Sequence, residues 1–435
     1  MTNKHTKHPS AVGSMPAMSR RTVLKGASAI GAASLFTSMG PSSLMSALAS
    51  QTSEMGLNVP LVRGLYQDNG ATPWYANLQL GTPAQNLKFA LDTGSNFVWV
   101  TSTLCQENDN ECRHTGGAAF DYNKSGSFVW CDRLPKDVGF GPWGEMTVET
   151  GADTFGISGK KLNASFYLAE NYAGPNFSEL DWDGGIGFPS SAQYVDPSTT
   201  FIMQELMRTR AFDAAYPFLS FSTDYATKQG TCLIGGVDNK AYDPFSGIFL
   251  PWEAFTGLGG AAKYLWTSPL RKYSVGSQTL ARDITFCLDS GSSQFKGDLD
   301  LIKKSLGIIN GSSVKPDITL DLGHTPFLRQ PGQVVITPDM YEVKLEAGRN
   351  AGQTLPQFET DLNIPALMLV GSILMDSVYS IFEYKVVGSS DPRVASLDPV
   401  GIWLFNKVGG PIVIRSRSDK PVVLGPRNIV PETGL

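Results

Sequence analysis

The sequence contains little charge and almost no histidine, and these shortages argue against several kinds of catalysis. Charged residues make up 17% of the 435 residues. Two of the four histidines fall within residues 1–49, which leaves His114 and His324 for the rest of the chain. A serine triad needs a histidine with a serine and an aspartate placed around it. His324 stands in Leu-Gly-His-Thr-Pro and is predicted to lie in a loop, so the sequence gives no support to such a triad.

Nucleotide-binding and membrane-spanning segments are also missing. No glycine-rich phosphate loop of the Walker or dinucleotide type follows a predicted strand, and Leu258-Gly259-Gly260 has the composition of a turn. The apolar stretch at residues 26–36 is too short and too rich in Ala, Gly and Ser to span a bilayer permanently. We therefore expect no bound nucleotide and no membrane association beyond export.

The body of the chain is acidic. Residues 1–49 contain five of the 35 basic residues and no acidic ones, which leaves 30 basic against 40 acidic residues and a formal charge of −10. An acidic surface argues against nucleic acid and anionic membranes as partners. It suits a protein that stays soluble in acid, where neutralised carboxylates leave few repelling cations.

Residues 1–49 are predicted to be an export signal. Ser-Arg-Arg-Thr-Val-Leu-Lys at residues 19–25 precedes the apolar stretch, and Ala47-Leu48-Ala49 offers a cleavage site. This arrangement resembles the twin-arginine signal peptides of bacteria. We expect a short connector at residues 50–59 and a periplasmic or extracellular protein. The alternatives are a disordered basic tail and a cofactor-carrying redox protein exported by the same route.

Five cysteines are present, and an odd number in an exported protein leaves at least one thiol without an intramolecular partner. Cys105 and Cys112 enclose a short polar loop and are the predicted disulfide. Cys232 and Cys287 stand in apolar runs and are expected to be buried thiols. Cys105, Cys112 and His114 could instead begin a zinc site, but a fourth ligand is missing nearby. We therefore expect no metal site.

One short motif occurs twice, as residues 91–95 (Leu-Asp-Thr-Gly-Ser) and residues 288–292 (Leu-Asp-Ser-Gly-Ser). Each copy follows an apolar run, which gives a charged side chain little solvation. Each carboxylate therefore needs hydrogen bonds or a partner, and the repetition suggests that Asp92 and Asp289 are partners. The alternative is that both aspartates only cap turns of a β-protein and have no catalytic role.

The elements around the two motifs recur in the same order. Strands are predicted at residues 74–80, 87–91 and 97–100, a hairpin with a Gly/Pro-rich tip at 138–148, and helices at 201–209 and 299–306. An apolar-Gly element follows each aspartate, so that Gly187 comes 95 residues after Asp92 and Gly371 comes 82 residues after Asp289. This order indicates a duplicated lobe. The composition, with 45 Gly and 27 Pro, favours an all-β chain.

These motifs resemble those of the pepsin-like aspartic proteases. The resemblance runs from about Pro60 to the carboxyl end and rests on residues 74–85, 91–95, 183–187, 288–292 and 369–371. With the export signal, the chain is similar to the bacterial members of this family. The resemblance implies an all-β fold with a few short helices and two lobes related by a pseudo-two-fold axis. The N-terminal lobe would span residues 60–245, the C-terminal lobe residues 246–435, and the active-site cleft would lie between them.

The resemblance also implies roles for individual residues. Asp92 and Asp289 match the catalytic pair. Thr93 and Ser290 match the residues that cross-link the two loops, and Ser95 and Ser292 match those that bond the outer carboxylate oxygens. The glycines of the motifs, together with the flap and substrate-binding residues, complete the predicted site: Gly94, Gly291, Trp99, Phe140, Gly141, Phe177 and Trp182.

The sequence departs from the family pattern in three places. The flap residue is usually a tyrosine whose hydroxyl bonds the tryptophan beneath it, whereas Phe140 stands here, with Trp143 nearby at a slightly longer tip. Only residues 50–73 separate the signal from the first clear strand, so no long basic prosegment is expected. The separation between Asp92 and Asp289 is longer than usual, which predicts insertions in surface loops.

The chemistry expected of such a site needs no cofactor beyond a water molecule. Two adjacent carboxylates in a poorly solvated site share one proton, so that one can deprotonate water while the other polarises a carbonyl. We expect a monomeric aspartic endopeptidase that acts on polypeptides between hydrophobic residues at acidic pH and is inhibited by pepstatin. The alternative is a catalytically weak binding or inhibitor-like protein with the same fold.

Overall fold

The repeated motifs lie in two sets of strands of similar design. The computed structural model describes residues 56–107, 112, 114, 116–174 and 176–428. All described residues belong to one unit, residues 48–435. The predicted signal peptide (1–49) and residues 50–55 of the connector lie outside the described residues. None of the helices in the described ranges is long and apolar enough to cross a membrane.

The first motif lies in a sheet formed by the first half of the chain. Its strands pair in the order β5–β6–β7–β4–β8–β3–β2, and β2 also pairs with β6. The bounds are β2 (Trp74–Leu80), β3 (Gln85–Asp92), β4 (Val98–Thr101), β5 (Val129–Gly139), β6 (Glu145–Ile157), β7 (Lys160–Ala173) and β8 (Gly184–Gly187), with helices α2 (Leu104–Glu107) and α3 (Ile202–Arg208). The predicted strands, the hairpin at 138–148 and the helix at 201–209 are confirmed.

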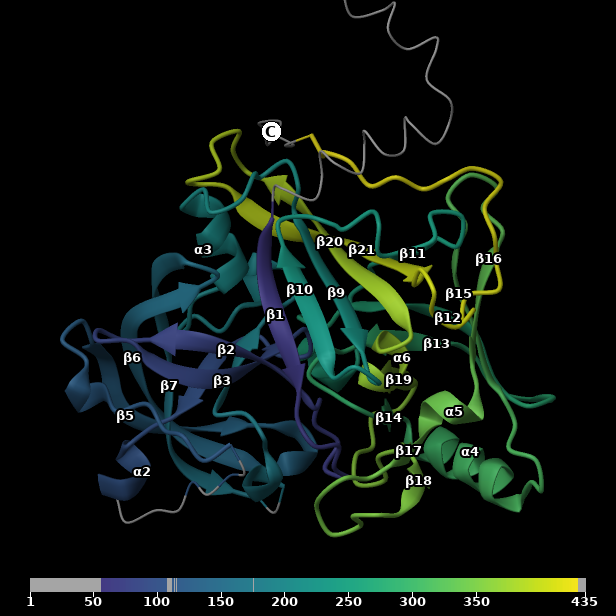
Figure 1. Ribbon diagram of the computed structural model, residues 1–435, viewed down its shortest axis with the longest axis horizontal. Coiled ribbons are helices and arrows are strands. Elements are labelled where there is room, and N and C mark those ends of the chain that lie inside the picture. Colours follow the sequence, from purple (N-terminus) through teal and green to yellow (C-terminus); the bar gives the residue numbers. More distant parts are fainter. Residues whose placement is uncertain (1–55, 108–111, 113, 115, 175, 429–435) are drawn as a thin grey trace, which may run out of the picture. The chain divides into compact units, whose positions relative to one another are not determined.

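A central set of strands joins the two halves of the chain. The pairs run β1–β10–β9–β20–β21–β11, so that strands from both ends of the sequence lie side by side. The bounds are β1 (Leu57–Arg63), β9 (Phe218–Asp224), β10 (Gln229–Ile234), β11 (Ile248–Pro251), β20 (Val378–Val387) and β21 (Ser396–Asn406). Figure 1 shows these strands between the first-half strands on the left and the second-half elements on the right.

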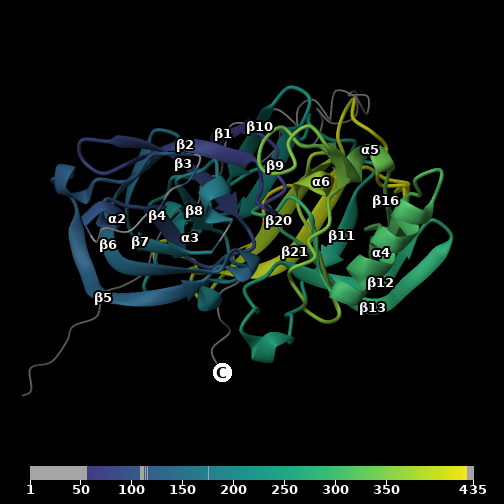
Figure 2. The same cartoon turned by 90° about the horizontal axis from the view of Figure 1, so that it is seen from below.

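The second motif lies in a set of strands that repeats the first design and continues the central strands beyond β11. Its core strands are β12 (Thr267–Val275), β13 (Gln278–Leu288), β14 (Phe295–Gly297), β15 (Ile318–His324), β16 (Pro331–Ile336) and β19 (Leu367–Val370). Helices α4 (Leu299–Gly311), α5 (Pro338–Tyr341) and α6 (Ser372–Met375) accompany it, and β17 (Glu342–Lys344) pairs separately with β18 (Thr354–Pro356). Figure 2 shows the two sheets at opposite sides of the central strands. The strand-rich architecture agrees with the expected bilobal pepsin-like fold.

Two details differ from the sequence prediction. β1 precedes the first predicted strand and occupies Leu57–Arg63, where the sequence predicted a connector up to residue 59 and no strand before residue 74. Its residues alternate between buried and exposed, but Pro60 within the strand and the polar residues around it obscure this pattern in the sequence. His324 ends strand β15 and pairs with Phe249 instead of lying in a loop. The predicted lobe boundaries stay a prediction, because the central strands continue across them.

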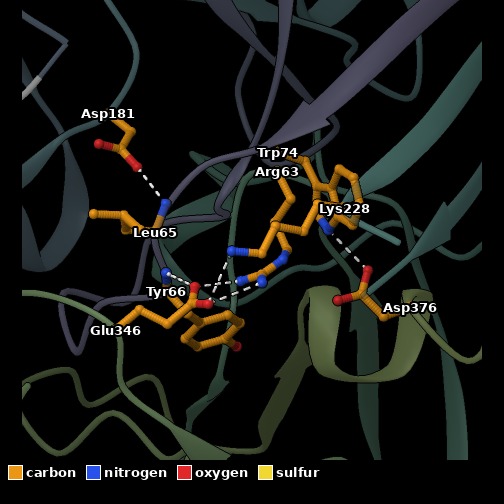
Figure 3. A network of polar contacts seen from close by, with 8 residues as sticks. All are labelled: Arg63, Leu65, Tyr66, Trp74, Asp181, Lys228, Glu346 and Asp376. Carbon is orange, nitrogen blue, oxygen red and sulfur yellow. Dashed lines mark hydrogen bonds and ion pairs between the residues drawn. The ribbon is translucent and has the colours of Figure 1, made fainter. Parts of the chain in front are cut away.

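Polar contacts also fasten β1 and β2 to the second half of the chain, as Figure 3 shows. The Arg63 guanidinium donates to both oxygens of Glu346, at 2.7 and 3.2 Å, and the backbone N–H of Tyr66 donates to the same carboxylate at 2.9 Å. Trp74 Nε1 donates to Asp376 at 2.8 Å. Burial raises the pKa of Asp376 to about 6, although hydrogen bonding and Lys407 favour its ionised form.

The Glu346 contacts persist into strong acid. Partial burial disfavours its ionised form, but hydrogen bonds from Arg63, Tyr66 and Lys228 outweigh burial and lower the pKa of Glu346 to about 2. Because the folded pKa lies below the unfolded value, the stabilisation is complete above about pH 4.5 and is lost only as pH falls toward 2. The two halves of the chain therefore stay fastened across the whole mildly acidic range.

Glu346→Gln is expected to lower the free energy of unfolding by about 2 kcal/mol at pH 6, because Arg63 is left buried with weaker partners. The difference should shrink as pH approaches 2. Denaturant unfolding of both proteins at several pH values measures it. Asp391→Asn is the control, since Asp391 pairs with Arg393 only two residues away at the surface. Equal effects of the two substitutions would contradict the prediction.

Candidate active site

Each aspartate of the repeated motif lies at the end of a strand that is held in the same way. Asp92 is the last residue of β3, which runs parallel to β8 and pairs Asp92 with Gly187. Asp289 follows β13, which runs parallel to β19, and its N–H donates to the Val370 carbonyl at 3.1 Å. The apolar-Gly elements predicted after each aspartate are therefore the strands that position the aspartates.

Reciprocal hydrogen bonds connect the two motif loops. The N–H of Thr93 donates to Ser290 Oγ at 3.0 Å, and the N–H of Ser290 donates to Thr93 Oγ1 at 2.9 Å. Each hydroxyl in turn donates to a carbonyl of the other strand: Ser290 Oγ to Leu91 at 2.6 Å and Thr93 Oγ1 to Leu288 at 3.4 Å. This geometry is the cross-link that the resemblance implied for Thr93 and Ser290.

The two carboxylates face each other across this connection. A side-chain carbon added at Gly94 would lie 2.4 Å from Asp289 Oδ1, and one added at Gly291 would lie 2.1 Å from Asp92 Oδ1. Each carboxylate therefore rests against the glycine that follows the other aspartate. Only glycine permits so close an approach of backbone to carboxylate.

Further hydrogen bonds orient the carboxylate oxygens. The N–H of Gly94 donates to Asp92 Oδ1 at 2.7 Å and the N–H of Gly291 to Asp289 Oδ1 at 2.8 Å. Ser292 Oγ donates to Asp289 Oδ2 at 2.6 Å, and Ser95 hydrogen-bonds Asp92. The structure thus brings together all eight residues of the two motifs that the sequence predicted at the site.

The pair is set up to hold a proton. Asp92 is 9% and Asp289 6% exposed. Burial raises the pKa of Asp92 well above its usual value, and the charge and hydrogen bond of Asp289 raise it further, against the opposing bonds from Gly94 and Ser95. A shared proton between the two carboxylates relieves the repulsion between them.

The hairpin of β5 and β6 places an aromatic cluster beside the pair. A short helical turn at Gly141–Trp143 forms its tip. The Phe140 ring lies 5.4 Å from that of Trp99 and stacks on Trp143 at 5.2 Å. Phe140 therefore occupies the position above Trp99 that the flap prediction gave it.

Phe177 and Trp182 lie behind this layer. Each is 1% exposed, and their rings pack against Phe140 and Trp99 at 5.8 and 5.9 Å respectively. Neither side chain lines the cavity above the carboxylates. They support the residues that face a ligand, and a direct role in substrate binding stays a prediction.

A cavity of about 350 Å³ opens over the carboxylates. Besides the motif residues it is lined by side chains of the flap, of a loop before β12 and of a segment before β19, most of them apolar: Phe97, Phe140, Trp143, Leu258, Ala262, Tyr264, Leu265, Leu362, Ile364, Leu367 and Leu369, with Lys296 and Asn363. Sequence reasoning missed Lys296. Its signal was its position seven residues after Asp289, as Trp99 stands seven residues after Asp92.

The cysteine and histidine predictions can also be placed. Cys105 and Cys112 form the predicted disulfide, which uses both thiols that the zinc alternative required, while Cys131 is exposed and Cys232 and Cys287 are buried thiols. His114 Nε2 lies 2.8 Å from Asp183 Oδ1, in a buried contact. Within the described ranges, no three His, Cys, Asp or Glu side chains are arranged to hold a metal.

Comparisons with known proteins identify one family. A model of the family "Eukaryotic aspartyl protease" matches residues 73–386. Human gastricsin (Homo sapiens) is 23% identical over 329 residues, which cover 71% of this chain and 78% of gastricsin. Gastricsin of Suncus murinus is 24% identical with the same coverage, and that of Oryctolagus cuniculus is 29% identical over 170 residues, 39% of this chain and 42% of its own.

Gly291→Ala is expected to lower the free energy of unfolding by about 2 kcal/mol, because the added carbon overlaps Asp92 and forces the loop apart. Denaturant unfolding measures the change. Gly307→Ala is the matched control, since nothing lies within 4 Å of the added carbon and the position is inside helix α4. That control should be neutral or stabilising by up to about 1 kcal/mol. A neutral Gly291→Ala would contradict the close approach of the two loops.

Proposed function

The chain belongs to the pepsin family of aspartyl proteases and is an aspartic-type endopeptidase, and we propose that it cleaves polypeptides by activating one water molecule between Asp92 and Asp289. The observation that carries the proposal is the pair of facing carboxylates, each resting against the glycine that follows the other. A pair sharing one proton contains both the base and the acid that hydrolysis needs.

The reaction uses the two protonation states in turn. The ionised carboxylate takes a proton from the water molecule as the water oxygen attacks the peptide carbonyl carbon. At the same time the protonated carboxyl gives its proton to the carbonyl oxygen. One hydroxyl of the resulting diol then gives its proton to the carboxylate that is now ionised, while the protonated carboxyl gives its proton to the amide nitrogen. The C–N bond breaks, and the pair is left with one proton as before. The raised pKa of Asp92 supports a proton that the pair shares at rest. Thr93, Ser290, Ser95 and Ser292 hold the geometry throughout.

The cavity favours apolar side chains on both sides of the cut bond. Phe97, Phe140 and Trp143 line one part of it, and aliphatic side chains such as Ile364 and Leu369 line the other. Burying a large apolar side chain contributes about 1.5–3 kcal/mol. The absence of a hydroxyl on Phe140 removes one hydrogen bond expected of the flap, so closure depends on ring packing with Trp99 and Trp143.

We also propose that the enzyme acts after export, as a monomer, in an acidic and oxidising compartment. The Cys105–Cys112 disulfide supports an oxidising environment. The twin-arginine motif in residues 19–25 would carry the folded protein there, to the periplasm or outside the cell. The pair can act as acid and base only while it holds its shared proton, so a rise in pH that removes this proton would inactivate the enzyme and acid would switch it on.

The central test uses Asp289→Asn, which removes one of the two exchanging groups. Cleavage of a denatured protein should have an acidic optimum, should be blocked by pepstatin, and should fall by at least about 100-fold in the variant. Asp283→Asn makes the same change on strand β13 at an exposed position and should keep its activity. Activity that survives Asp289→Asn would show that the protein cuts by another route, and no cleavage by the wild type would favour the binding-protein alternative.

Asp92→Asn should abolish activity and yet stabilise the protein at neutral pH. Because the folded pKa of Asp92 is raised, the unfolded chain ionises first as pH rises above about 4, and the folded state loses stability over that range. The variant lacks this loss, so its Tm should exceed that of the wild type by about 2 °C or more at pH 7 and match it near pH 4. Thermal unfolding at both pH values decides this, with Asp283→Asn again as control.

A further inference from the structure

Lys296 is a cation placed in the cleft by the duplicated fold. It stands on β14, seven residues after Asp289, and its counterpart in the first half is Trp99 on β4, seven residues after Asp92. Both side chains are buried, with Lys296 only 5% exposed, and Lys296 lines the cavity above the carboxylates. The repeat therefore places a buried aromatic ring at this position in the first half and an ammonium group that lines the cavity in the second.

The surroundings of Lys296 leave its charge only partly compensated. The ammonium lies over the Trp143 ring, 5.8 Å from its centre. A side-chain carbon at Gly70 would lie 3.2 Å from both Lys296 Nζ and Glu359 Oε2, so the lysine and the glutamate approach the same point. Yet among the residues that the structure describes, no ion pair within 4 Å involves Lys296.

Such an ammonium group favours an incoming anion. Burial lowers the pKa of Lys296, whereas Asp289, Glu359 and Asp92 all act to keep the ammonium protonated. A buried charge without a close partner is unfavourable, and a carboxylate that reaches it forms a strong, charge-assisted hydrogen bond. The catalytic carboxylates stabilise this charge from a distance, since no ion pair within 4 Å joins either of them to Lys296 among the described residues.

We propose that Lys296 is a specificity-determining residue that binds a carboxylate of the substrate, so that the enzyme prefers peptides with an aspartate or glutamate close to the cut bond. The inference rests on the proposed peptidase function and refines it: the flap side of the cavity takes apolar side chains and the Lys296 side takes an acidic one. The carboxylate belongs to a substrate side chain, and a free peptide C-terminus with the same chemistry is separated from it by the test.

The experiment compares peptides that differ in one group. A set of end-capped peptides with a fixed apolar pair at the cut bond carries Glu or Gln at each neighbouring position in turn. At pH 5, above the usual glutamate pKa of about 4.3, kcat/KM for the preferred Glu peptide should exceed that for Gln by about tenfold or more. The ratio should shrink toward one near pH 3. A parallel set with uncapped C-termini and Gln throughout tests the terminal carboxylate.

Three variants identify the source of the preference. Lys296→Met should reduce the Glu/Gln ratio to about twofold or less, and Lys296→Arg, which keeps the charge, should retain most of it. Lys272→Met removes a half-buried lysine that pairs with Asp321 away from the cleft, and should leave the ratio unchanged. If Lys296→Met does not fold, loss of the preference in Lys296→Gln with retention in Lys296→Arg gives the same answer.

The outcomes separate this inference from the function on which it rests. A wild-type enzyme that cleaves with pepstatin sensitivity but shows no Glu preference overturns the inference alone. So does a preference that survives Lys296→Met, a preference confined to free C-termini, or a shift of the whole pH profile in Lys296→Met with an unchanged ratio, which would make Lys296 a counter-ion of the catalytic pair. Activity that survives Asp289→Asn overturns both.

Discussion

The rest of the molecule depends on the reciprocal hydrogen bonds between Thr93 and Ser290. Two carboxylates of like charge separate unless something holds them, and these bonds fasten the loops that carry them without using the carboxylates themselves. Because each hydroxyl also donates to a carbonyl of the opposite strand, neither loop can shift alone. The parallel partners β8 and β19 then fix where each loop begins. The duplicated sets of strands therefore serve chiefly to bring two matching turns together.

Acid acts on this scaffold in one direction. Protonation relieves the repulsion at the Asp92 and Asp289 pair, whose ionised form the buried site disfavours. The contacts of Glu346 with Arg63 and Tyr66, which fasten the first strands to the second half, resist protonation until about pH 2. The condition that favours the catalytic state therefore leaves the fastening between the halves intact. If the contacts of Glu346 were lost at the pH that protonates the catalytic pair, the protein would lose stability under the conditions in which it is active.

The sequence predicted what local patterns encode and missed what tertiary contacts decide. The motif around Asp92 and its repeat at Asp289, the strands before them and the flap hairpin follow from apolar runs, glycines and their order. Strand β1 was missed because its pairing with β10 lies more than 150 residues away in the sequence and its own residues are mixed in character. Phe177 and Trp182 were predicted to bind substrate only because they match residues of the family's specificity pocket. Whether an aromatic ring faces a ligand or supports another ring is decided by packing, which periodicity does not reveal.

Lys296 shows how a duplicated scaffold acquires direction. The repeat gives Trp99 and Lys296 equivalent places on β4 and β14, yet the first half surrounds its residue with rings and the second half leaves an ammonium facing the cavity. A symmetric cleft would accept a peptide equally well in either chain direction, because the peptide would meet equivalent carboxylates in both. Different side chains at equivalent positions remove that degeneracy, since an apolar and an acidic group on the substrate cannot exchange places without burying a carboxylate among aromatic rings. The motif residues can therefore stay alike for chemistry, while Lys296, which lines the cavity where Trp99 does not, distinguishes its two sides.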